Sequence, residues 1–321
     1  MTPLNKAAAF IATHGRLLDR RRFELATGIA EADAGADCLL AALAGYGNPD
    51  GGYGHGLEPD LRTATSQPCA ALHAFEVFEQ IAVGADARSA GAPLGVDARS
   101  AGAPLGTFPA AARLCDWLGS ITLPDGGLPF ALPIPDRAGC APYFLDVDPN
   151  QSSLHMTSML AGIAHRIARH DGAVREHPWL ATATEYSLRR IRLAEWPGFA
   201  LEFHYALWFL DAVHDVVPEA AGELSRLGRY LPASGCLAVA GGAEGEALRP
   251  LDFAPIPNRP VRALFTAETI QAELDGLVSE QRHDGGWAVN WTAFSPAAAL
   301  EWRGYATVRA VSILTANGRV P

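Results

Sequence analysis

The chain has 321 residues, of which 49% are hydrophobic and 19% are charged, and its formal net charge is −10. This length allows one large domain or two ordinary ones, and the hydrophobic content is ample for a buried core. The acidic balance argues against a basic face of the kind that binds nucleic acid, so we expect no nucleic-acid partner.

Helical periodicity dominates the sequence. Apolar residues recur at helical spacing in the following segments, which we predict to be helices: 4–24, 35–46, 66–82, 108–120, 151–170, 177–192, 199–215, 218–230, 267–281 and 296–316. Proline follows a potential capping residue near four of the starts, where the first helical turn tolerates it: Thr2-Pro3, Asp148-Pro149, His177-Pro178 and Ser295-Pro296. Alternating strand patterns are scarce, so the sequence predicts an all-α chain.

A tandem duplication interrupts this pattern. GADARSAGAPL (84–94) is followed at once by GVDARSAGAPL (95–105), and the copies differ at one position, where Ala85 corresponds to Val96. The segment is rich in Gly, Ala, Pro and Ser, a composition typical of an exposed loop. We therefore predict a mobile loop insertion at 84–105 and assign it no chemical role.

An Asp-Gly-Gly sequence occurs three times, each time after the end of a predicted helix. It lies in NPDGGYGHGLEPD (48–60), LPDGGLPF (123–130) and RHDGGWAVNW (282–291). Glycine suits a chain that leaves a helix through a left-handed conformation, and the aspartate can accept hydrogen bonds from turn amides. Because these sites follow helices rather than strands, we interpret them as structural joints and not as phosphate-binding loops.

The spacing of the joints predicts repeated helical hairpins. Asp50 and Asp125 are 75 residues apart, and removing the 22 duplicated residues leaves 53. Degenerate turns at 195–199 and 232–236 could supply the joints before Asp284. Hairpins of about fifty residues, repeated five or six times, would stack into a closed ring in which the last helix lies beside the first.

The third joint resembles a known repeat. Gln281, Gly285 and Trp287 follow the Q-x-x-x-G-x-W pattern of squalene and terpene cyclases, which also recurs in protein prenyltransferase β-subunits. The chain is therefore similar to the prenyltransferase/squalene-oxidase repeat superfamily, in its short single-domain bacterial form. This resemblance implies one α/α toroid over residues 1–321, a ring of inner and outer helices in about six hairpins.

The sequence departs from that family in three places. The first two joints carry Gly47 and Thr122 where the pattern has Gln. The Asp-x-Cys pair that helps to hold zinc in protein prenyltransferases does not occur, so we expect no such zinc site. The acid motif Asp-x-Asp-Asp of the class II terpene cyclases is approached at Asp146-Val147-Asp148, but Pro149 replaces the last aspartate.

Asp146 and Asp148 allow two interpretations. In the functional one, Asp148 is a general acid that burial keeps protonated, and Asp146 orients it. In the structural one, Asp148 caps a helix, with Pro149 at the first helical position and Gln151 completing a capping box. The cap is the favoured interpretation, although one residue could serve both roles.

The segment GHGLEPDLRTATSQP (54–68) holds the richest polar cluster. Glu58 and Asp60 flank a proline, with His55 and Arg62 close by in sequence. Two carboxylates at a cavity mouth could act as acid and base or hold a divalent ion. The alternative is a salt-bridged loop in which Arg62 neutralises Asp60, and Ser66 or Gln67 opens the next helix.

Aromatic residues mark two further candidate regions. The carboxy-terminal stretch gathers five of them, which could bind an apolar chain or stabilise a cation, or could form the core: Trp287, Trp291, Phe294, Trp302 and Tyr305. The segment 199–213 is apolar nearly all round and suits an inner helix; its candidate ligand-binding residues are Phe203, Trp208 and the unusual charge Glu202. His155 and His165 lie on another apolar helix and are interpreted as hydrogen-bonded core residues.

These observations favour a terpene-cyclase-like protein with a central apolar cavity, which cyclises or isomerises an isoprenoid by proton-initiated chemistry. One alternative is a non-catalytic toroid that binds an isoprenoid, another lipid or a protein; a carbohydrate-active toroid with a carboxylate pair is a weaker one. We expect no cofactor.

No apolar run reaches the roughly eighteen residues of a membrane span, and no cleavage-type signal is present, so we predict a cytoplasmic protein without a transmembrane segment. The five cysteines form no C-x-x-C pair, so the sequence predicts neither a disulfide framework nor a zinc knuckle.

Overall fold

The computed structural model describes residues 1–29, 32–89 and 109–319, and these residues are mainly helical. The longer helices are α1 (Pro3–His14), α2 (Leu17–Thr27), α3 (Ala32–Ala44), α4 (Pro68–Ser89), α5 (Pro109–Ser120), α7 (Leu154–Ala168), α9 (Pro178–Leu193), α10 (Ala200–Val213), α11 (Ala220–Gly228), α13 (Ala267–Ser279) and α14 (Pro296–Ala316). Between them lie α6 (Pro142–Leu145), α8 (Gly172–Arg175), α12 (Pro250–Phe253) and the 3-10 helix η1 (Pro260–Leu264). Two short antiparallel pairs join β1 (Leu128–Pro129) to β2 (Ser152–Ser153) and β3 (Leu237–Ala238) to β4 (Ala247–Leu248). The predicted all-α class is confirmed.

Two predicted helices differ most from the helices of the structure. The segment 4–24 divides into α1 and α2, because the chain is extended at Gly15 and Arg16. The Asp19 carboxylate then caps α2 by accepting from the Arg16 backbone N–H at 3.2 Å. Helix α4 continues to Ser89, beyond its predicted end, so the duplicated segment begins in helix and not in a loop. The rest of that segment, 90–105, lies outside the described residues.

Three of the four proline-marked helix starts are confirmed. In each, the capping side chain accepts a hydrogen bond from an amide of the first turn: Thr2, His177 and Ser295. The fourth is wrong, because Ser153 caps α7 by accepting from the Met156 amide at 3.1 Å. Asp148 instead begins a turn and accepts from the Asn150 amide at 2.9 Å. Pairing of β1 with β2 keeps Ser153 extended, and helix formation starts after it.

The three Asp-Gly-Gly joints share one geometry, as predicted. The first glycine of each has a left-handed φ, which side chains rarely adopt: Gly51 (93°), Gly126 (90°) and Gly285 (94°). The aspartate accepts from the amide of the second glycine in every joint: Asp50–Gly52 at 2.9 Å, Asp125–Gly127 at 3.1 Å and Asp284–Gly286 at 3.2 Å. A single short sequence thus makes the same turn three times along the chain.

Each joint also packs against a helix other than the one that it follows. A Cβ atom on the second glycine would lie 2.6 to 2.8 Å from an aromatic ring: Trp117 on α5 for Gly52, Tyr186 on α9 for Gly127 and Phe10 on α1 for Gly286. The third contact joins the carboxy-terminal part of the chain to the first helix. Gln281 strengthens that junction, since its side-chain amide donates to the Pro3 carbonyl at 2.8 Å.

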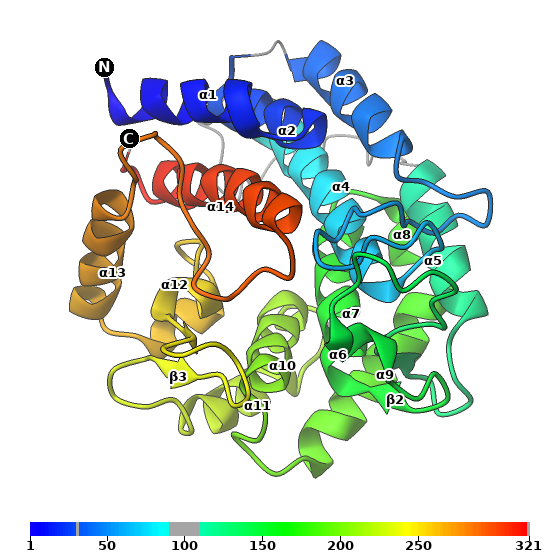
Figure 1. The fold of residues 1–321 in the computed structure, drawn as a ribbon. Helices are drawn as coiled ribbons and strands as arrows, with labels where there is room; N and C mark the ends of the chain where they lie inside the picture. The colour runs from blue at the N-terminus through cyan, green and yellow to red at the C-terminus, as the bar shows by residue number, and fades with distance from the viewer. Residues whose placement is uncertain (30–31, 90–108, 320–321) are drawn as a thin grey trace.

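The helices pack on one another in a continuous order. Helix α2 packs against α3 and α4, α4 against α7, and α7 against α9 and α10. Helix α10 packs against α11 and α12, α12 against α13, and α13 against α14. Helix α14 then packs against α1 and α2, so the two ends of the chain meet. Figure 1 shows this succession around the molecule, with the first and last helices side by side.

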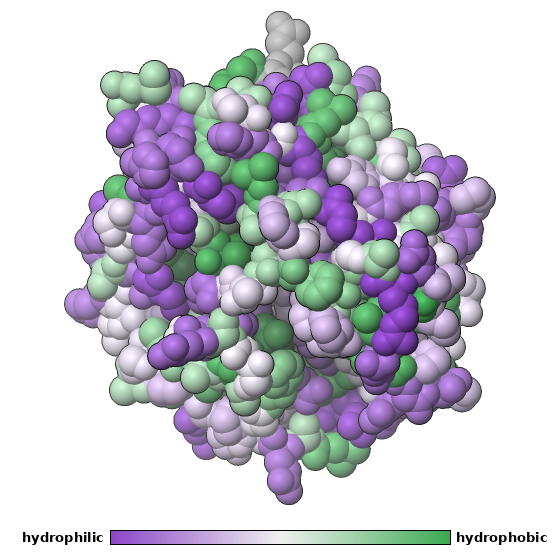
Figure 2. All heavy atoms as spheres, in the orientation of Figure 1, coloured by the Kyte–Doolittle hydropathy of each residue, from purple (hydrophilic) through white to green (hydrophobic). Residues whose placement is uncertain are grey.

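The hydrophobic core extends through these helices. Helix α7 is buried along most of its length, and residues of α4, α9 and α10 pack around it. Figure 2 shows the face seen in Figure 1, which is mainly polar and is hollowed near its middle, where hydrophobic residues are visible. Of the helices that the structure describes, none combines the length and the hydrophobicity that crossing a bilayer requires.

Candidate functional site

The carboxylates of Asp146 and Asp148 lie at the surface. The Asp146 side chain is 77% exposed and accepts a hydrogen bond from Arg137 at 2.8 Å. Asp148 is exposed and holds the turn described above. The general-acid hypothesis required burial to keep Asp148 protonated, and that burial is absent. The alternative of a helix cap is also wrong, because Ser153 caps α7.

The loop 54–67 buries both of its candidate carboxylates. Glu58 is 4% exposed and Asp60 is 1% exposed. Arg16, at the start of α2, donates to the Leu57 carbonyl at 3.0 Å and so ties this loop to the first helices. Glu58 accepts from the Asp60 amide at 3.1 Å, which fixes the turn between them. The two carboxylate groups then bind different partners and form two centres.

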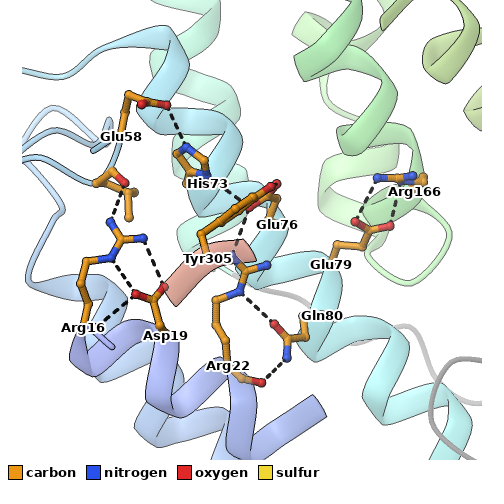
Figure 3. A network of polar contacts seen from close by, with 11 residues as sticks. Arg16, Asp19, Arg22, Glu58, His73, Glu76, Glu79, Gln80, Arg166 and Tyr305 are labelled. Carbon is orange, nitrogen blue, oxygen red and sulfur yellow. Dashed lines mark hydrogen bonds and ion pairs between the residues drawn. The ribbon is translucent and has the colours of Figure 1, made fainter. Parts of the chain in front are cut away.

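Glu58 begins a chain of alternating carboxylates and imidazole, which we call the Glu58–His73–Glu76 triad. Glu58 Oε2 accepts from His73 Nε2 at 3.0 Å and from Cys69 Sγ at 3.3 Å. His73 Nδ1 bonds to the Glu76 carboxylate at 3.2 Å. Cys69, His73 and Glu76 are spaced three or four residues apart on α4, so they share one face of the helix. Figure 3 shows His73 lying between the two glutamates.

Glu76 connects the triad to both ends of the chain. Its Oε1 accepts from the Tyr305 hydroxyl on α14 at 2.7 Å, and its Oε2 accepts from Arg22 on α2 at 3.2 Å. Gln80, one turn further along α4, accepts from the same guanidinium at 3.1 Å. Figure 3 shows Arg22 and Tyr305 approaching Glu76 from neighbouring helices. Every polar group of the triad therefore has a partner.

The charge states in the triad follow from these contacts. Burial disfavours a charged imidazole, but the hydrogen bonds to Glu58 and Glu76 outweigh it and raise the pKa of His73 to about 9. Burial also opposes the charge on Glu76, yet the hydrogen bond from His73 and the charge of Arg22 lower the pKa of Glu76 to about 2. Burial raises the pKa of the Cys69 thiol, which remains a neutral donor. Near neutral pH the triad thus holds an imidazolium between carboxylates.

Asp60 forms the second centre, and its partners are neutral donors. Its Oδ2 accepts from the Trp302 indole N–H at 2.7 Å, and its Oδ1 accepts from the Phe294 amide at 2.7 Å. The Tyr143 hydroxyl lies 3.5 Å from Oδ2. Asp60 therefore joins three segments that are distant in sequence, and it fixes the position of the Trp302 ring.

Arg62 does not neutralise Asp60, so that part of the structural interpretation is wrong. Its guanidinium pairs with Glu301 on α14 at 2.8 Å. Gln67 precedes α4, as predicted, and its side chain bonds the backbone of Leu132. His55 is exposed, and its Nε2 bonds the Asn48 side chain at 3.0 Å. Neither His55 nor Arg62 contributes a hydrogen bond to Glu58 or Asp60 within the described part of the chain.

Aromatic rings from α14 and the loop before it pack beside the triad, and we call them the aromatic wall. The His73 ring lies 5.9 Å from Trp302 and 5.4 Å from Tyr305, centroid to centroid. Trp302 makes edge contacts with Tyr305 at 5.4 Å and with Trp291 at 5.0 Å. Trp302 and Tyr305, three residues apart on α14, therefore share one face of the helix. Phe294 contributes its backbone amide, and its side chain is largely exposed.

Three other predicted ligand-binding residues lie on α10 and have different surroundings. Phe203 is fully buried and packs with other aromatic rings in the core. Trp208 is half-buried beneath the Arg166 guanidinium, which lies 4.0 Å from its ring centroid. Glu202 is half-buried too; burial raises its pKa, and the charge of Arg190 on α9 opposes that rise. Trp208 therefore contacts a charged side chain, whereas Phe203 belongs to the core.

The sequence reasoning missed the centre of the triad. His73 and Glu76 lie in the apolar stretch ALHAFEVFEQI, where an imidazole and a carboxylate three residues apart should have been noticed. Arg22 and Tyr305 gave no local signal, because they come from the two ends of the chain. Their partnership with Glu76 depends on the tertiary fold.

Two further features of the structure bear on ligand binding. Among the described residues, no group of three His, Cys, Asp or Glu side chains has the arrangement of a metal site. An open depression of about 430 Å³ lies beside the second joint, and its lining includes Asp125, Ser152 and Arg190. It contains none of the triad residues, and within it the Ser152 hydroxyl donates to Asp125, which also accepts from the Gly127 amide of the joint.

The fold and the site define a mainly helical protein with a buried acid–base centre beside an aromatic wall. Comparison with models of known protein families gives no match, and no curated protein matches the chain in sequence. The chemistry is therefore inferred from the residues themselves. An imidazolium between carboxylates can give up and take back a proton, and aromatic faces bind apolar chains and cations.

Proposed function

We propose that the helices form a closed α/α toroid of the terpene-cyclase-like type. Support comes from the three joints, each of which packs on a further outer helix, and from α14, which packs on α1 and α2. In this arrangement α2, α4, α7, α10 and α14 are the inner helices. They carry His73, Glu76, Arg22 and Tyr305, so the toroid would turn its polar centre towards its own hub.

Within this toroid, the triad acts as the acid–base centre for a small ligand bound against the aromatic wall. The observation that carries this proposal is the buried imidazole of His73, held between two carboxylates beside the rings of Trp302 and Tyr305. Buried charges contribute little net stability even when fully paired. Such clusters are typical of functional sites, where proton transfer requires them. The sequence resemblance favours an isoprenoid as the apolar ligand.

The acid strength of the centre indicates which reaction it could perform. With a pKa of about 9, the His73 imidazolium is too weak an acid to protonate an isolated alkene efficiently. The centre is better suited to removing a proton from an activated carbon and returning it elsewhere. We therefore favour isomerisation of an isoprenoid over proton-initiated cyclisation.

One observation favours a second candidate, a toroid that binds an isoprenoid without converting it. Glu58, His73 and Glu76 already satisfy one another and take further bonds from Cys69, Tyr305 and Arg22. A network so complete could hold the inner helices in place and leave the ligand unchanged.

Incubation in deuterated water distinguishes these candidates. The protein is mixed with isoprenoid alcohols, aldehydes, diphosphates and hydrocarbons from farnesyl to squalene size, and the products are analysed by mass spectrometry. Isomerisation should introduce deuterium, and Glu58→Gln or His73→Gln should slow it by about 100-fold or more. The matched control is Glu185→Gln, whose side chain is 82% exposed on α9 and which should keep full activity. Binding without exchange would support the second candidate, and neither binding nor exchange would refute both.

A further inference from the structure

Two polar rings on α7 and α10 lack hydrogen-bond partners. His155 on α7 and Tyr205 on α10 stack with their centroids 4.9 Å apart and an angle of 18° between the ring planes. Both side chains are half-buried. Within the described part of the chain, neither the ring nitrogens of His155 nor the Tyr205 hydroxyl makes a hydrogen bond, although His155 was expected to be bonded in the core. Their polar atoms are therefore free to bind another molecule.

The other histidines on these two helices each make a hydrogen bond. His165 on α7 bonds the Thr184 hydroxyl at 2.7 Å. His204 on α10 bonds the Asp252 carbonyl through Nε2 at 3.0 Å, and its Nδ1 is buried without a partner among the described residues. The polar atoms of His155 and Tyr205 remain accessible at the protein surface, so a ligand can bond both of them.

Tyr205 lies within electrostatic reach of the triad. Burial raises the pKa of Tyr205 well above its usual value, and the nearby carboxylates of Glu76 and Glu58 add to the rise. The phenol therefore stays protonated and can donate a hydrogen bond. A molecule that bonds this hydroxyl would therefore lie within electrostatic reach of the triad, where the acid–base chemistry is proposed.

The ligand atom that fits this pair is uncharged. Burial lowers the pKa of His155 to about 3, so its imidazole is neutral, with one donor and one acceptor nitrogen. The nearby cations are already paired: Arg166 lies 2.8 Å from Glu79, and Arg309 lies 2.9 Å from Asp252. A diphosphate or carboxylate at His155 would meet no free positive charge among these groups.

Apolar rings surround the polar pair. The His155 ring lies 5.6 Å from Phe130 and 6.5 Å from Phe199, and the Tyr205 ring lies 5.9 Å from Trp208. These rings can accommodate an apolar chain on either side of the bonded atom. The site therefore combines one pair of neutral hydrogen-bonding groups with hydrophobic surroundings.

We infer that His155 and Tyr205 bind a single hydroxyl or carbonyl oxygen of an otherwise apolar ligand. A ligand hydroxyl can accept from the Tyr205 phenol and donate to the unprotonated nitrogen of His155. A carbonyl can accept from the phenol and from the protonated nitrogen. This inference rests on the proposed ligand site and narrows its substrate class to isoprenoid alcohols, aldehydes or ketones, in place of hydrocarbons and diphosphates.

Four probes of equal chain length test this inference on the full chain: farnesol, farnesal, farnesene and farnesyl diphosphate. Isothermal titration calorimetry should show that farnesol and farnesal bind about tenfold or more tightly than farnesene and farnesyl diphosphate, because the unbonded polar groups disfavour ligands without a neutral oxygen. His155→Phe and Tyr205→Phe should each lower the affinity for farnesol several-fold and leave that for farnesene unchanged. His155→Gln, which keeps a donor and an acceptor, should restore much of the preference.

The outcomes separate this inference from the proposed function. Equal affinity for farnesol and farnesene, or a preference that survives both phenylalanine variants, overturns the inference and leaves the ligand site standing. Absence of binding for all four probes overturns both. If the variants do not fold, NMR of the histidine imidazoles in the wild-type protein still tests the inference. The His155 signals should shift when farnesol is added and remain unchanged with farnesene. A shift with farnesene but not with farnesol refutes the inference.

Discussion

Replacement of Glu58 by glutamine tests the triad directly, because it removes one charge and preserves the shape of the side chain. The glutamine carbonyl can still accept from His73, Cys69 or the Asp60 amide, so the packing should survive. The loss is that of a negative charge 3.0 Å from the imidazole. We expect a lower pKa for His73 and a smaller free energy of unfolding.

The magnitude follows from the pKa of His73. It is about 9 in the folded protein, compared with 6.5 for an ordinary histidine. Each unit corresponds to about 1.4 kcal/mol, so the surroundings favour the imidazolium by roughly 3 kcal/mol. Because Glu76 shares this effect, Glu58→Gln should lower the pKa of His73 by about 1 to 2 units and the free energy of unfolding by about 1 to 3 kcal/mol at neutral pH.

Two measurements check this expectation. An NMR titration of the His73 imidazole protons gives its pKa, and urea unfolding gives the free energy of unfolding. Glu185→Gln, the exposed control, should change stability by less than about 0.5 kcal/mol. A wild-type His73 that titrates near 6.5, or one whose pKa is the same in Glu58→Gln, would refute the reasoning about the triad.

Two further predictions concern stability. Gly286→Ala should lower the free energy of unfolding, measured with urea, by about 1 to 3 kcal/mol, because the new Cβ would lie 2.8 Å from the Phe10 ring. The control is Gly222→Ala on α11, where a Cβ would have no atom within 4 Å and the change should be neutral or stabilising. Equal effects of the two substitutions would contradict the packing of the third joint. Stability should be greatest near pH 6.5. Towards pH 9 the unfolded chain releases a proton that folded His73 keeps, which costs about 1.4 kcal/mol per pH unit. Below pH 6.5 the decline should be steeper, because burial lowers the pKa of three histidines that the unfolded chain protonates freely: His155, His165 and His204. Chemical denaturation followed by circular dichroism from pH 4.5 to 9 measures this profile, and an unchanged stability below pH 6.5 would count against neutral buried histidines.

The features predicted well from the sequence are those that neighbouring residues determine. The Asp-Gly-Gly joints depend on a left-handed glycine and a carboxylate that accepts from the turn, and both lie within three residues. The carboxylates Glu58 and Asp60 were noticed because they stand together in one polar loop.

The failures occurred where distant contacts decide between local alternatives. Asp148-Pro149 has the sequence of a helix start, but pairing of Ser152 and Ser153 with β1 keeps the chain extended beyond it. Arg62 stands two residues from Asp60, yet Glu301 on α14 takes its guanidinium. In both cases the local sequence favours one arrangement, but a contact with a residue from elsewhere in the chain determines the structure.

The same long-range contacts make the site and the fold depend on each other. Glu76 on α4 is completed by Arg22 on α2 and by Tyr305 on α14, and the Asp60 loop is completed by Trp302. These partners come together because α14 packs on α2, a contact that the third joint supports through Phe10 and Pro3. Without that contact, His73 would keep Glu58 and Glu76 but lose the aromatic wall and the guanidinium that help to hold the charges in place. The acid–base centre is therefore a property of the assembled helices and not of the α4 segment, which explains why residues far apart in sequence must be considered together to identify it.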